Sequence, residues 1–567
     1  MKSHSLVLVS LSFLLMFTLS ACVSATQTPV ATEVQTVATE GQPVATEVQP
    51  AEPQAAKEAI LRVGWSSEPD TMNPLTTYST EALEVLALVY DKLLDYDLTF
   101  KTVPSLAEEY TYSDDGLTLT FKLRQGVKWH DGKPFSAEDA AFTYNLIKDN
   151  ELGRYVQWLT HMTSATATDA NTFVLTFDLP QSFNPGLAIP ILPKHIWSSM
   201  SAEDIEAFSN DKPIGTGPYR FVEWQVGSQI TLERNLEYWG KLPAPTKVIY
   251  VLYGNEDVMA QALKSGDIDI VTEVPPTIWD GLAGAENIKA VSMPSFSFHH
   301  IAFNIGEGPK SPGNPLLRDK AIRQALSYAL DRNQLVQVAL AGHGKPGDSV
   351  LPIGLTDWYL PIPADKQMNA DPEKAKQILE AAGYVDSNGD GVREDSSGSP
   401  LKFRLIAIET TTVDVRAAQL FRDAAAAVGV ELDLQTLDEN TLGELVYNFD
   451  NPDWDVHVWG WDLNYPDPTD LVSAFVCGGG NNEIFYCNQT YDELYNKQTT
   501  TLDYNARKAF VDQMQLIFYE DAAYLVMWYQ DKLQAYRTDT WTGWTEIPGG
   551  VIYNMTRENY LTIQPVQ

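Results

Sequence analysis

The chain has 567 residues, and its 75 acidic side chains against 39 basic ones give a formal charge of −36. A balance this acidic excludes the nucleic-acid-binding classes, because binding to phosphates requires a basic face. The length is sufficient for two or three domains around a large apolar core.

The N-terminus has the features of an export signal. Residues 6–19 are nearly all apolar, a stretch too short for a comfortable permanent membrane span but typical of a signal-peptide core. The next run, LSAC at 19–22, resembles the bacterial lipobox, in which Cys22 is acylated and becomes the first residue. We therefore expect a lipoprotein signal peptide at 1–21. An ordinary secretory signal that adjoins a cysteine is the alternative.

Residues 22–57 are predicted to form a flexible linker. The sequence VATE recurs at 30–33, 37–40 and 44–47, with a period of seven. A heptad period suggests a coiled coil, but Thr, Gln, Pro and Glu fill most positions and cannot bury enough surface to offset the entropy of ordering. A disordered tether would hold a globular body close to the membrane.

Strand and helix patterns alternate through the rest of the chain. Apolar residues recur with period two at 117–123 and at 173–177, which predicts two strands. The sequence SAED at 136–139 predicts a capping box that opens a helix. Asp371-Pro372 begins another helix, which Gly383 ends. This alternation predicts an α/β protein with mixed sheets.

Several sequence blocks occur together in a characteristic order. The most specific block reads GVKWHDGKPFSAED at 126–139, and the others are EPDTMNP at 68–74, GTGPY at 215–219, ALKSGDID at 262–269 and RQALSYALD at 323–331. Together they resemble the extracellular solute-binding proteins of the dipeptide/oligopeptide class, bacterial solute-binding protein family 5. The resemblance extends over essentially all of residues 60–560.

This resemblance implies a fold and a domain organisation. The fold is a two-lobed periplasmic-binding-protein-like fold of type II, with an extra inserted domain and a hinge between the lobes. The implied parts are lobe I (58–101, 215–303 and 523–567), an inserted domain (102–214) and lobe II (304–522). Within the inserted domain, we expect His130 and Asp131 to make turn and sheet contacts rather than to catalyse a reaction.

The resemblance also implies a function. The protein would be the substrate-binding component of an ABC importer, which captures di- to oligopeptides between its lobes and delivers them to the permease subunits. It would be a monomer and not an enzyme, would need no cofactor, and would contact the membrane only through its lipid anchor. Oligosaccharides or nickel and other metal chelates are alternative cargoes. A secreted hydrolase is an alternative class, for which the sequence has no positive motif.

The segment DVHVWGWDLNYPDP at 455–468 is predicted to contact the ligand. It reads as a buried strand followed by a Pro-rich loop, and open α/β folds bind ligands at the carboxyl ends of their strands. In related peptide binders an Asp in this stretch pairs with the peptide α-ammonium group, which by resemblance is Asp462, or Asp467 if the alignment slips. Strand alternation places Trp459 and Trp461 on one face, where they would form cleft walls or pack in the core.

An enclosed peptide requires such a carboxylate, because an unpaired buried ammonium group costs several kcal/mol. The peptide main chain can then be held by strand-like pairing with protein backbone.

Two further groups of residues suggest specific chemistry. Cys477 and Cys487 are an even pair in an exported chain, which predicts a disulfide. The run that contains Asp386, Asn388 and Asp390 resembles the start of a calcium loop. Ser397 stands where such a loop needs a bidentate Glu, and the same residue types are typical of a plain turn. We expect no other metal site.

Overall fold

The computed structural model describes residues 58–307, 311–463 and 465–567. The predicted signal peptide at 1–21, the acylated Cys22 and the linker up to residue 57 lie outside these residues. Within the described part, none of the helices combines the length and the apolar character that a membrane crossing requires.

The described residues form strands and helices in alternation. The strands are β1 (Ile60–Trp65), β2 (Leu94–Tyr96), β3 (Thr102–Pro104), β4 (Ala107–Tyr112), β5 (Thr118–Leu123), β6 (Met162–Asp169), β7 (Thr172–Phe177), β8 (Tyr219–Gln225), β9 (Gln229–Arg234), β10 (Lys247–Leu252), β11 (Ile270–Val271), β12 (Ile288–Pro294), β13 (Ser297–Phe303), β14 (Gly344–Pro346), β15 (Lys402–Ile408), β16 (Glu431–Leu437), β17 (Val456–Asp462), β18 (Tyr524–Arg537), β19 (Trp541–Thr542) and β20 (Gln564–Pro565). The α-helices are α1 (Thr80–Val89), α2 (Ala137–Asp149), α3 (Lys194–Trp197), α4 (Ala202–Glu206), α5 (Glu256–Ser265), α6 (Pro276–Ala283), α7 (Lys320–Ala329), α8 (Arg332–Ala339), α9 (Pro372–Ala381), α10 (Thr412–Ala426), α11 (Glu439–Val446), α12 (Thr469–Val472), α13 (Gln489–Thr500), α14 (Tyr504–Asp521) and α15 (Glu558–Thr562).

A mixed sheet of twelve strands runs through the described part of the chain. Its order is β16-β15-β17-β13-β18-β11-β1-β10-β9-β8, and β12 and β14 also pair with β18. β1 runs parallel to β10 and β15 runs parallel to β16, whereas β18 is antiparallel to its partners. The α/β fold with mixed sheets that the sequence predicts is confirmed.

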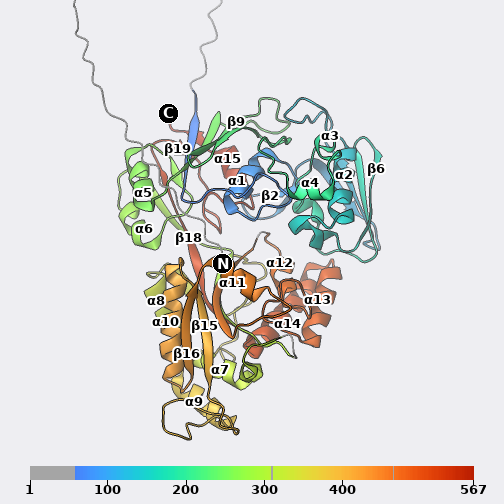
Figure 1. Cartoon of the computed structure of the whole chain (residues 1–567). Coiled ribbons are helices and arrows are strands. Elements are labelled where there is room, and N and C mark those ends of the chain that lie inside the picture. Colours follow the sequence, from blue (N-terminus) through green and yellow to red (C-terminus); the bar gives the residue numbers. More distant parts are fainter. Residues whose placement is uncertain (1–57, 308–310, 464) are drawn as a thin grey trace, which may run out of the picture. The chain divides into compact units, whose positions relative to one another are not determined.

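Strand β18 belongs to both halves of this sheet, which Figure 1 shows above and below it. Its first half, from Tyr524 to Trp528, pairs with β13, and its second half, from Asp531 to Arg537, pairs with β12. β13 also pairs with β17 along its whole length. The chain therefore passes from one half of the sheet to the other within one continuous strand. The exact bounds expected for the lobes and the inserted domain remain a prediction.

A second sheet, with the order β4-β5-β7-β6, lies within residues 102–214. The alternating Leu and Phe side chains of β5 and β7 are buried, and the rings of Phe121 and Phe173 stack with centroids 5.9 Å apart. Helix α2 packs on β6 and β7, and it begins where the backbone N–H of Ser136 donates to Asp139 Oδ2 at 3.0 Å. The two strands and the capping box that the sequence predicts are thus present.

Two of the family-like sequence blocks contact each other through His130. Gly215 N donates to His130 Nδ1 at 3.3 Å, and His130 Nε2 lies 3.0 Å from Gly217 O. Gly215 cannot carry a side chain, because an added Cβ would lie 1.8 Å from Val89 O. These residues therefore fix how residues 102–214 pack on the rest of the chain, in agreement with the structural role expected for His130.

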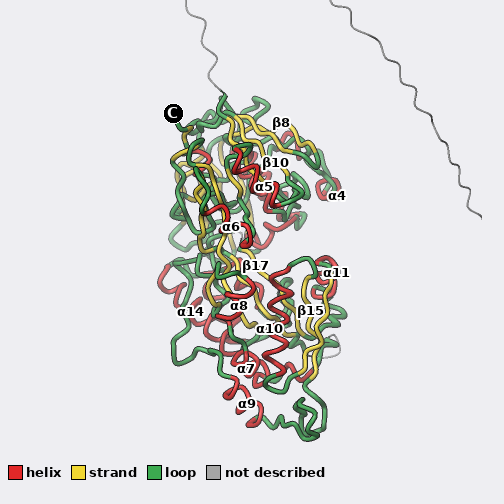
Figure 2. Tube along the Cα trace, turned by 90° about the vertical axis from the view of Figure 1, so that its left-hand side faces the viewer, coloured by secondary structure: helices red, strands yellow, loops and turns green. Residues whose placement is uncertain are grey.

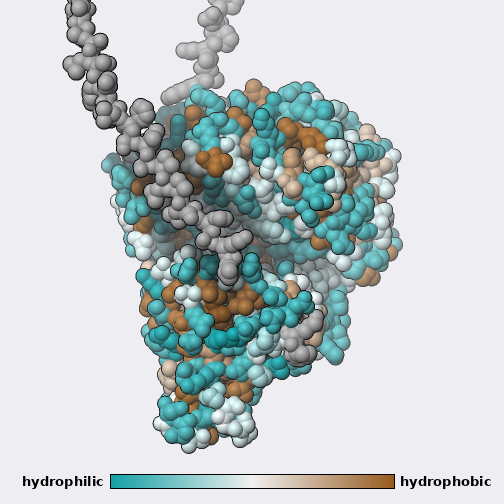
Figure 3. Space-filling view, viewed as in Figure 1, coloured by the Kyte–Doolittle hydropathy of each residue, from teal (hydrophilic) through white to brown (hydrophobic). Residues whose placement is uncertain are grey.

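Helices cover the sheets and leave a polar exterior. Helix α10 packs on β15 and β16, and Figure 2 shows it beside β15. The face seen in Figure 3 is mostly hydrophilic, with apolar residues in scattered patches. This surface agrees with the strongly acidic composition of the chain.

Candidate ligand-binding cleft

A cleft of about 550 Å³ lies at the carboxyl end of β17. Its lining comes from separate parts of the chain: Tyr78, Gly153, Arg154, Val156, Gln157, Tyr447, Trp461, Asp462, Leu463, Asp470, Leu471 and Asn481. The cleft volume falls within the range of sites that bind small molecules. Its position agrees with the rule that open α/β folds bind ligands beyond the carboxyl ends of their strands.

Asp462 is the last residue of β17, and its exposed carboxylate lines the cleft. The strand places it there because β17 pairs with β13, with Asp462 opposite Ser297. No described residue donates a hydrogen bond to this carboxylate or forms an ion pair with it. The group is therefore available to bind a cation that enters the cleft.

The two tryptophans of β17 have different surroundings. Trp461 lines the cleft, whereas Trp459 is not among the lining residues. The half-buried Trp459 ring packs edge-on against Tyr447 and His457, with centroids 6.3 Å and 6.0 Å away. Trp461 thus has the position expected of a cleft wall, and Trp459 packs behind it against the core.

Asp467, the alternative anchor, is directed into the protein. Its side chain is nearly buried, and its two oxygens accept from the guanidinium group of Arg507 at 2.7 Å and 2.8 Å. Asp467 Oδ1 also accepts from the backbone N–H of Thr469 at 2.9 Å. This carboxylate is already paired, so the expectation that it could hold a ligand is not supported by its position.

Arg154 contributes a cation to the cleft. It lies in the 3₁₀ helix Gly153–Leu159, and the carboxylate of Asp470, which also lines the cleft, is one of the groups that raise the pKa of Arg154. That group lies over the rings of Tyr78 and Tyr155, 5.7 Å and 6.0 Å from their centroids. The cleft therefore presents two carboxylate residues, Asp462 and Asp470, and one cationic residue, Arg154.

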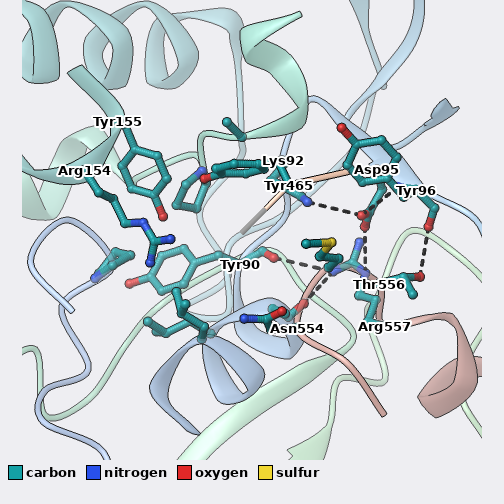
Figure 4. A pocket seen from close by; sticks show the side chains of 17 residues that line it. Tyr90, Lys92, Asp95, Tyr96, Arg154, Tyr155, Tyr465, Asn554, Thr556 and Arg557 are labelled. Atoms are coloured by element: carbon teal, nitrogen blue, oxygen red, sulfur yellow. Dashed lines mark hydrogen bonds and ion pairs between the residues drawn. The ribbon is translucent and has the colours of Figure 1, made fainter. Parts of the chain in front are cut away.

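A smaller pocket of about 80 Å³, shown in Figure 4, shares Arg154 with the cleft. Its other charged side chains are held in ion pairs. Arg557 contacts Asp91 at 2.5 Å and Asp95 at 3.3 Å, and Lys92 lies 3.4 Å from Asp95. These pairs account for the charges without a ligand, so we assign this pocket a structural role.

The calcium-like loop is held by its own side chains. Asp386 Oδ1 and Oδ2 accept from the backbone N–H groups of Gly389 and Gly391, at 2.6 Å and 3.0 Å. Asn388 Oδ1 accepts from Asp390 N at 2.8 Å, and its Nδ2 donates to Glu394 Oε1 at 2.7 Å. These are the hydrogen bonds of a turn, and calcium binding here stays a prediction.

The disulfide between Cys477 and Cys487 is present. It closes a loop that carries Asn481, one of the cleft residues, and Glu483, which is buried. The loop therefore connects the wall of the cleft to the interior beneath it.

Comparison with known proteins identifies the family. The sequence matches the model of the bacterial extracellular solute-binding proteins, family 5 Middle, over residues 101–483. The chain belongs to this family. The oligopeptide-binding protein AppA of Bacillus subtilis is 30% identical to this solute-binding protein over 515 residues, which cover 89% of this chain and 92% of AppA.

Solved structures give the same result for the fold. The structure of Bacillus subtilis AppA in complex with a nonapeptide has a TM-score of 0.75 at 27% identity, and covers 90% of this chain and 99% of AppA. NikZ of Campylobacter jejuni in complex with Ni(L-His) has a TM-score of 0.73 at 23% identity, and the match covers 89% of this chain and 99% of NikZ. A mannohexaose-bound protein of Thermotoga maritima has a TM-score of 0.74 at 22% identity, and the match covers 90% of this chain and 99% of that protein. The expected two-lobed binding-protein fold is thus confirmed.

The sequence did not predict several other residues that line the cleft of this solute-binding protein. Tyr78, Arg154 and Asn481 carry no motif and come from three distant segments. The one available signal was weak: Asn481 lies in the loop closed by the predicted disulfide, beside the predicted binding segment.

Proposed function

We propose that this protein is the substrate-binding component of an ABC importer and that it captures peptides in the cleft at the end of β17. The observation that carries the proposal is the exposed carboxylate of Asp462 in the cleft wall, for which the described residues supply no hydrogen-bond donor or ion-pair partner. The relative AppA is an oligopeptide-binding protein whose structure contains a nonapeptide, and this supports a peptide as the cargo.

The charges of the cleft suit a zwitterionic ligand. Asp462 would pair with the α-ammonium group of the peptide, because a carboxylate at this position avoids an unpaired ammonium charge on enclosure. Arg154 would bind a peptide carboxylate, either terminal or on a side chain, through its planar set of donors. Trp461 and Tyr447 would contact the ligand between these charges.

We further propose that the protein acts outside the cytoplasm as a lipid-anchored monomer. The lipobox-like run that ends at Cys22 supports the anchor, and the linker to residue 57 supports a body held close to the membrane. Delivery would then occur to permease subunits in that same membrane.

Thermal shifts with defined ligands test the cargo. A peptide present at about 1,000 times its Kd should stabilise the protein by about 4 kcal/mol, whereas oligosaccharides and nickel–histidine should not. N-acetylation of the peptide should abolish the shift, because it removes the ammonium group that Asp462 would pair with. Stabilisation by sugars or chelates alone would contradict a peptide cargo.

Matched substitutions test the anchor. Asp462→Asn should weaken binding of free peptides at least tenfold, to the level that N-acetylated peptides reach with the wild type. Asp257→Asn, on the exposed first turn of α5, is the control and should bind as the wild type does. Equal binding by Asp462→Asn and the wild type would remove Asp462 from the site.

A further inference from the structure

Three buried side chains meet behind the wall of the cleft. His300 lies on β13, His457 lies on β17, and Glu483 lies in the loop closed by the disulfide. The two histidine side chains are 0% exposed and the glutamate side chain is 2% exposed. One potential ligand atom from each residue lies within 4.8 Å of the other two.

Their polar atoms converge on one carboxylate oxygen. Glu483 Oε1 lies 3.2 Å from His300 Nε2 and 3.7 Å from His457 Nε2, and it accepts a hydrogen bond from the hydroxyl group of Tyr524. The other oxygen, Oε2, accepts from the hydroxyl group of Tyr447 at 3.1 Å. Two imidazole nitrogens and two oxygens are thus gathered in one small volume.

The histidines of this cluster have unsatisfied ring nitrogens. Among the described residues, neither nitrogen of His457 has a hydrogen-bond partner, and Nδ1 of His300 has none. Buried polar groups without partners are rare in folded proteins because their desolvation is not compensated, and each requires an explanation. His457 Nε2 is directed at Glu483, yet 3.7 Å is too long for a hydrogen bond.

Metal binding would use both histidines as neutral imidazoles and Glu483 as a carboxylate. His300 Nε2 lies within hydrogen-bond distance of Glu483 Oε1, so this nitrogen would carry no proton when it binds the ion, and the ring proton would sit on Nδ1.

We propose that His300, His457 and Glu483 bind a divalent transition-metal ion of the zinc class. Zinc prefers imidazole and carboxylate ligands in four-coordinate sites, with bonds of about 2.0–2.2 Å. Such bonds set ligand atoms about 3.3–3.6 Å apart, close to the separations observed at Glu483 Oε1. Calcium and magnesium prefer sites made only of oxygen atoms.

The ion would be structural and not cargo, because its ligands are buried. It would join two strands of the sheet to the disulfide loop. Two neighbours of Glu483 line the cleft. Tyr447 donates a hydrogen bond to Glu483, and Asn481 precedes Glu483 by two residues in the chain. The ion would therefore hold part of the cleft wall in place. This inference does not depend on which cargo the cleft binds.

Metal analysis of the full-length protein tests the site. The protein is unfolded in the presence of a chelator, refolded with or without Zn²⁺, and dialysed. We expect about one zinc ion per chain by mass spectrometry, and a melting temperature on the order of 5 °C above that of the metal-free protein. Refolding with Co²⁺ should give the visible absorption bands of a tetrahedral cobalt site, which added Zn²⁺ removes.

Substitutions identify the ligands. His457→Gln and Glu483→Gln should each lose the bound ion. His161→Gln, at a partly exposed histidine, and Asp390→Asn, in the calcium-like loop, are the controls and should retain it. If a variant fails to refold, the cobalt spectrum of the wild-type protein shows whether the site binds a metal ion. Wild-type protein without zinc or cobalt bands, or an ion retained equally in His457→Gln, would overturn the proposal.

Discussion

Asp462 and Asp467 are the same residue type in the same stretch, but their side chains face opposite environments. Asp462 is exposed in the cleft, whereas Asp467 pairs with Arg507 in the interior. Their local sequences are too similar to separate the two roles. The distinction is made by Arg507, forty residues beyond Asp467 in the chain, so only the tertiary structure could supply it.

Asp467→Asn should therefore affect stability and not binding. Removing one partner of a buried ion pair leaves the other charge uncompensated, and we expect a loss of about 3–5 kcal/mol in the free energy of unfolding. Denaturant unfolding measures this loss, while peptide affinity of the folded fraction should stay within twofold of the wild type. A large loss of peptide affinity with an unchanged free energy of unfolding would instead indicate that Asp467 contacts the ligand.

His130 should make stability depend on pH. Burial lowers the pKa of His130 to about 4, against about 6.5 in the unfolded chain. Because the pKa of His130 is lower in the folded state, the unfolded state binds the proton first as the pH falls. The contribution of His130 to the free energy of unfolding is therefore present above pH 6.5 and is lost as the pH falls toward 4. Between pH 7 and pH 5 this loss amounts to about 2 kcal/mol.

Unfolding of the wild type and of His130→Asn at both pH values measures this contribution. The variant should be less stable at pH 7 and should lose about 2 kcal/mol less than the wild type on acidification. An identical pH dependence in the two proteins would assign the effect to other groups.

At the scale of elements, the local patterns were the most predictable. The period-two apolar residues form β5 and β7, and the helix predicted to begin at Asp371-Pro372 is α9, with Asp371 as its N-cap. These patterns can be predicted because the burial of one face of a strand or helix leaves a periodic spacing of apolar residues in the local sequence. The 3₁₀ helix that carries Arg154 has no such period, so the sequence predicted neither this element nor the position of Arg154 in the cleft wall.

The 3₁₀ helix begins at a glycine that should be irreplaceable. Gly153 has φ +63°, and an added Cβ would lie 1.9 Å from the carbonyl oxygen of Leu75. Gly153→Ala should therefore move this helix, with its neighbour Arg154, and lower the melting temperature by several degrees. Peptide binding should weaken as well, and calorimetry measures both effects. Gly227→Ala is the matched control, since Gly227 also has a positive φ but open space around it.

At the scale of the whole molecule, the N-terminal segment predicts where the protein resides. Cys22→Ser should abolish acylation, so that the exported protein no longer partitions with the membrane. Fractionation with metabolic labelling by a fatty acid measures both outcomes. Cys487→Ser, which breaks the disulfide but keeps Cys22, should remain acylated and membrane-bound. Unchanged membrane association of Cys22→Ser would indicate another anchor.

The continuity of β18 has a consequence for how the molecule denatures. Its residues 524–528 complete one half of the large sheet, and residues 531–537 complete the other. If either half melted alone, part of β18 would lose its neighbours and expose backbone groups and apolar side chains to water. The described part of the chain should therefore unfold in one cooperative transition, and the central amides of β18 should be among the slowest to exchange with deuterium.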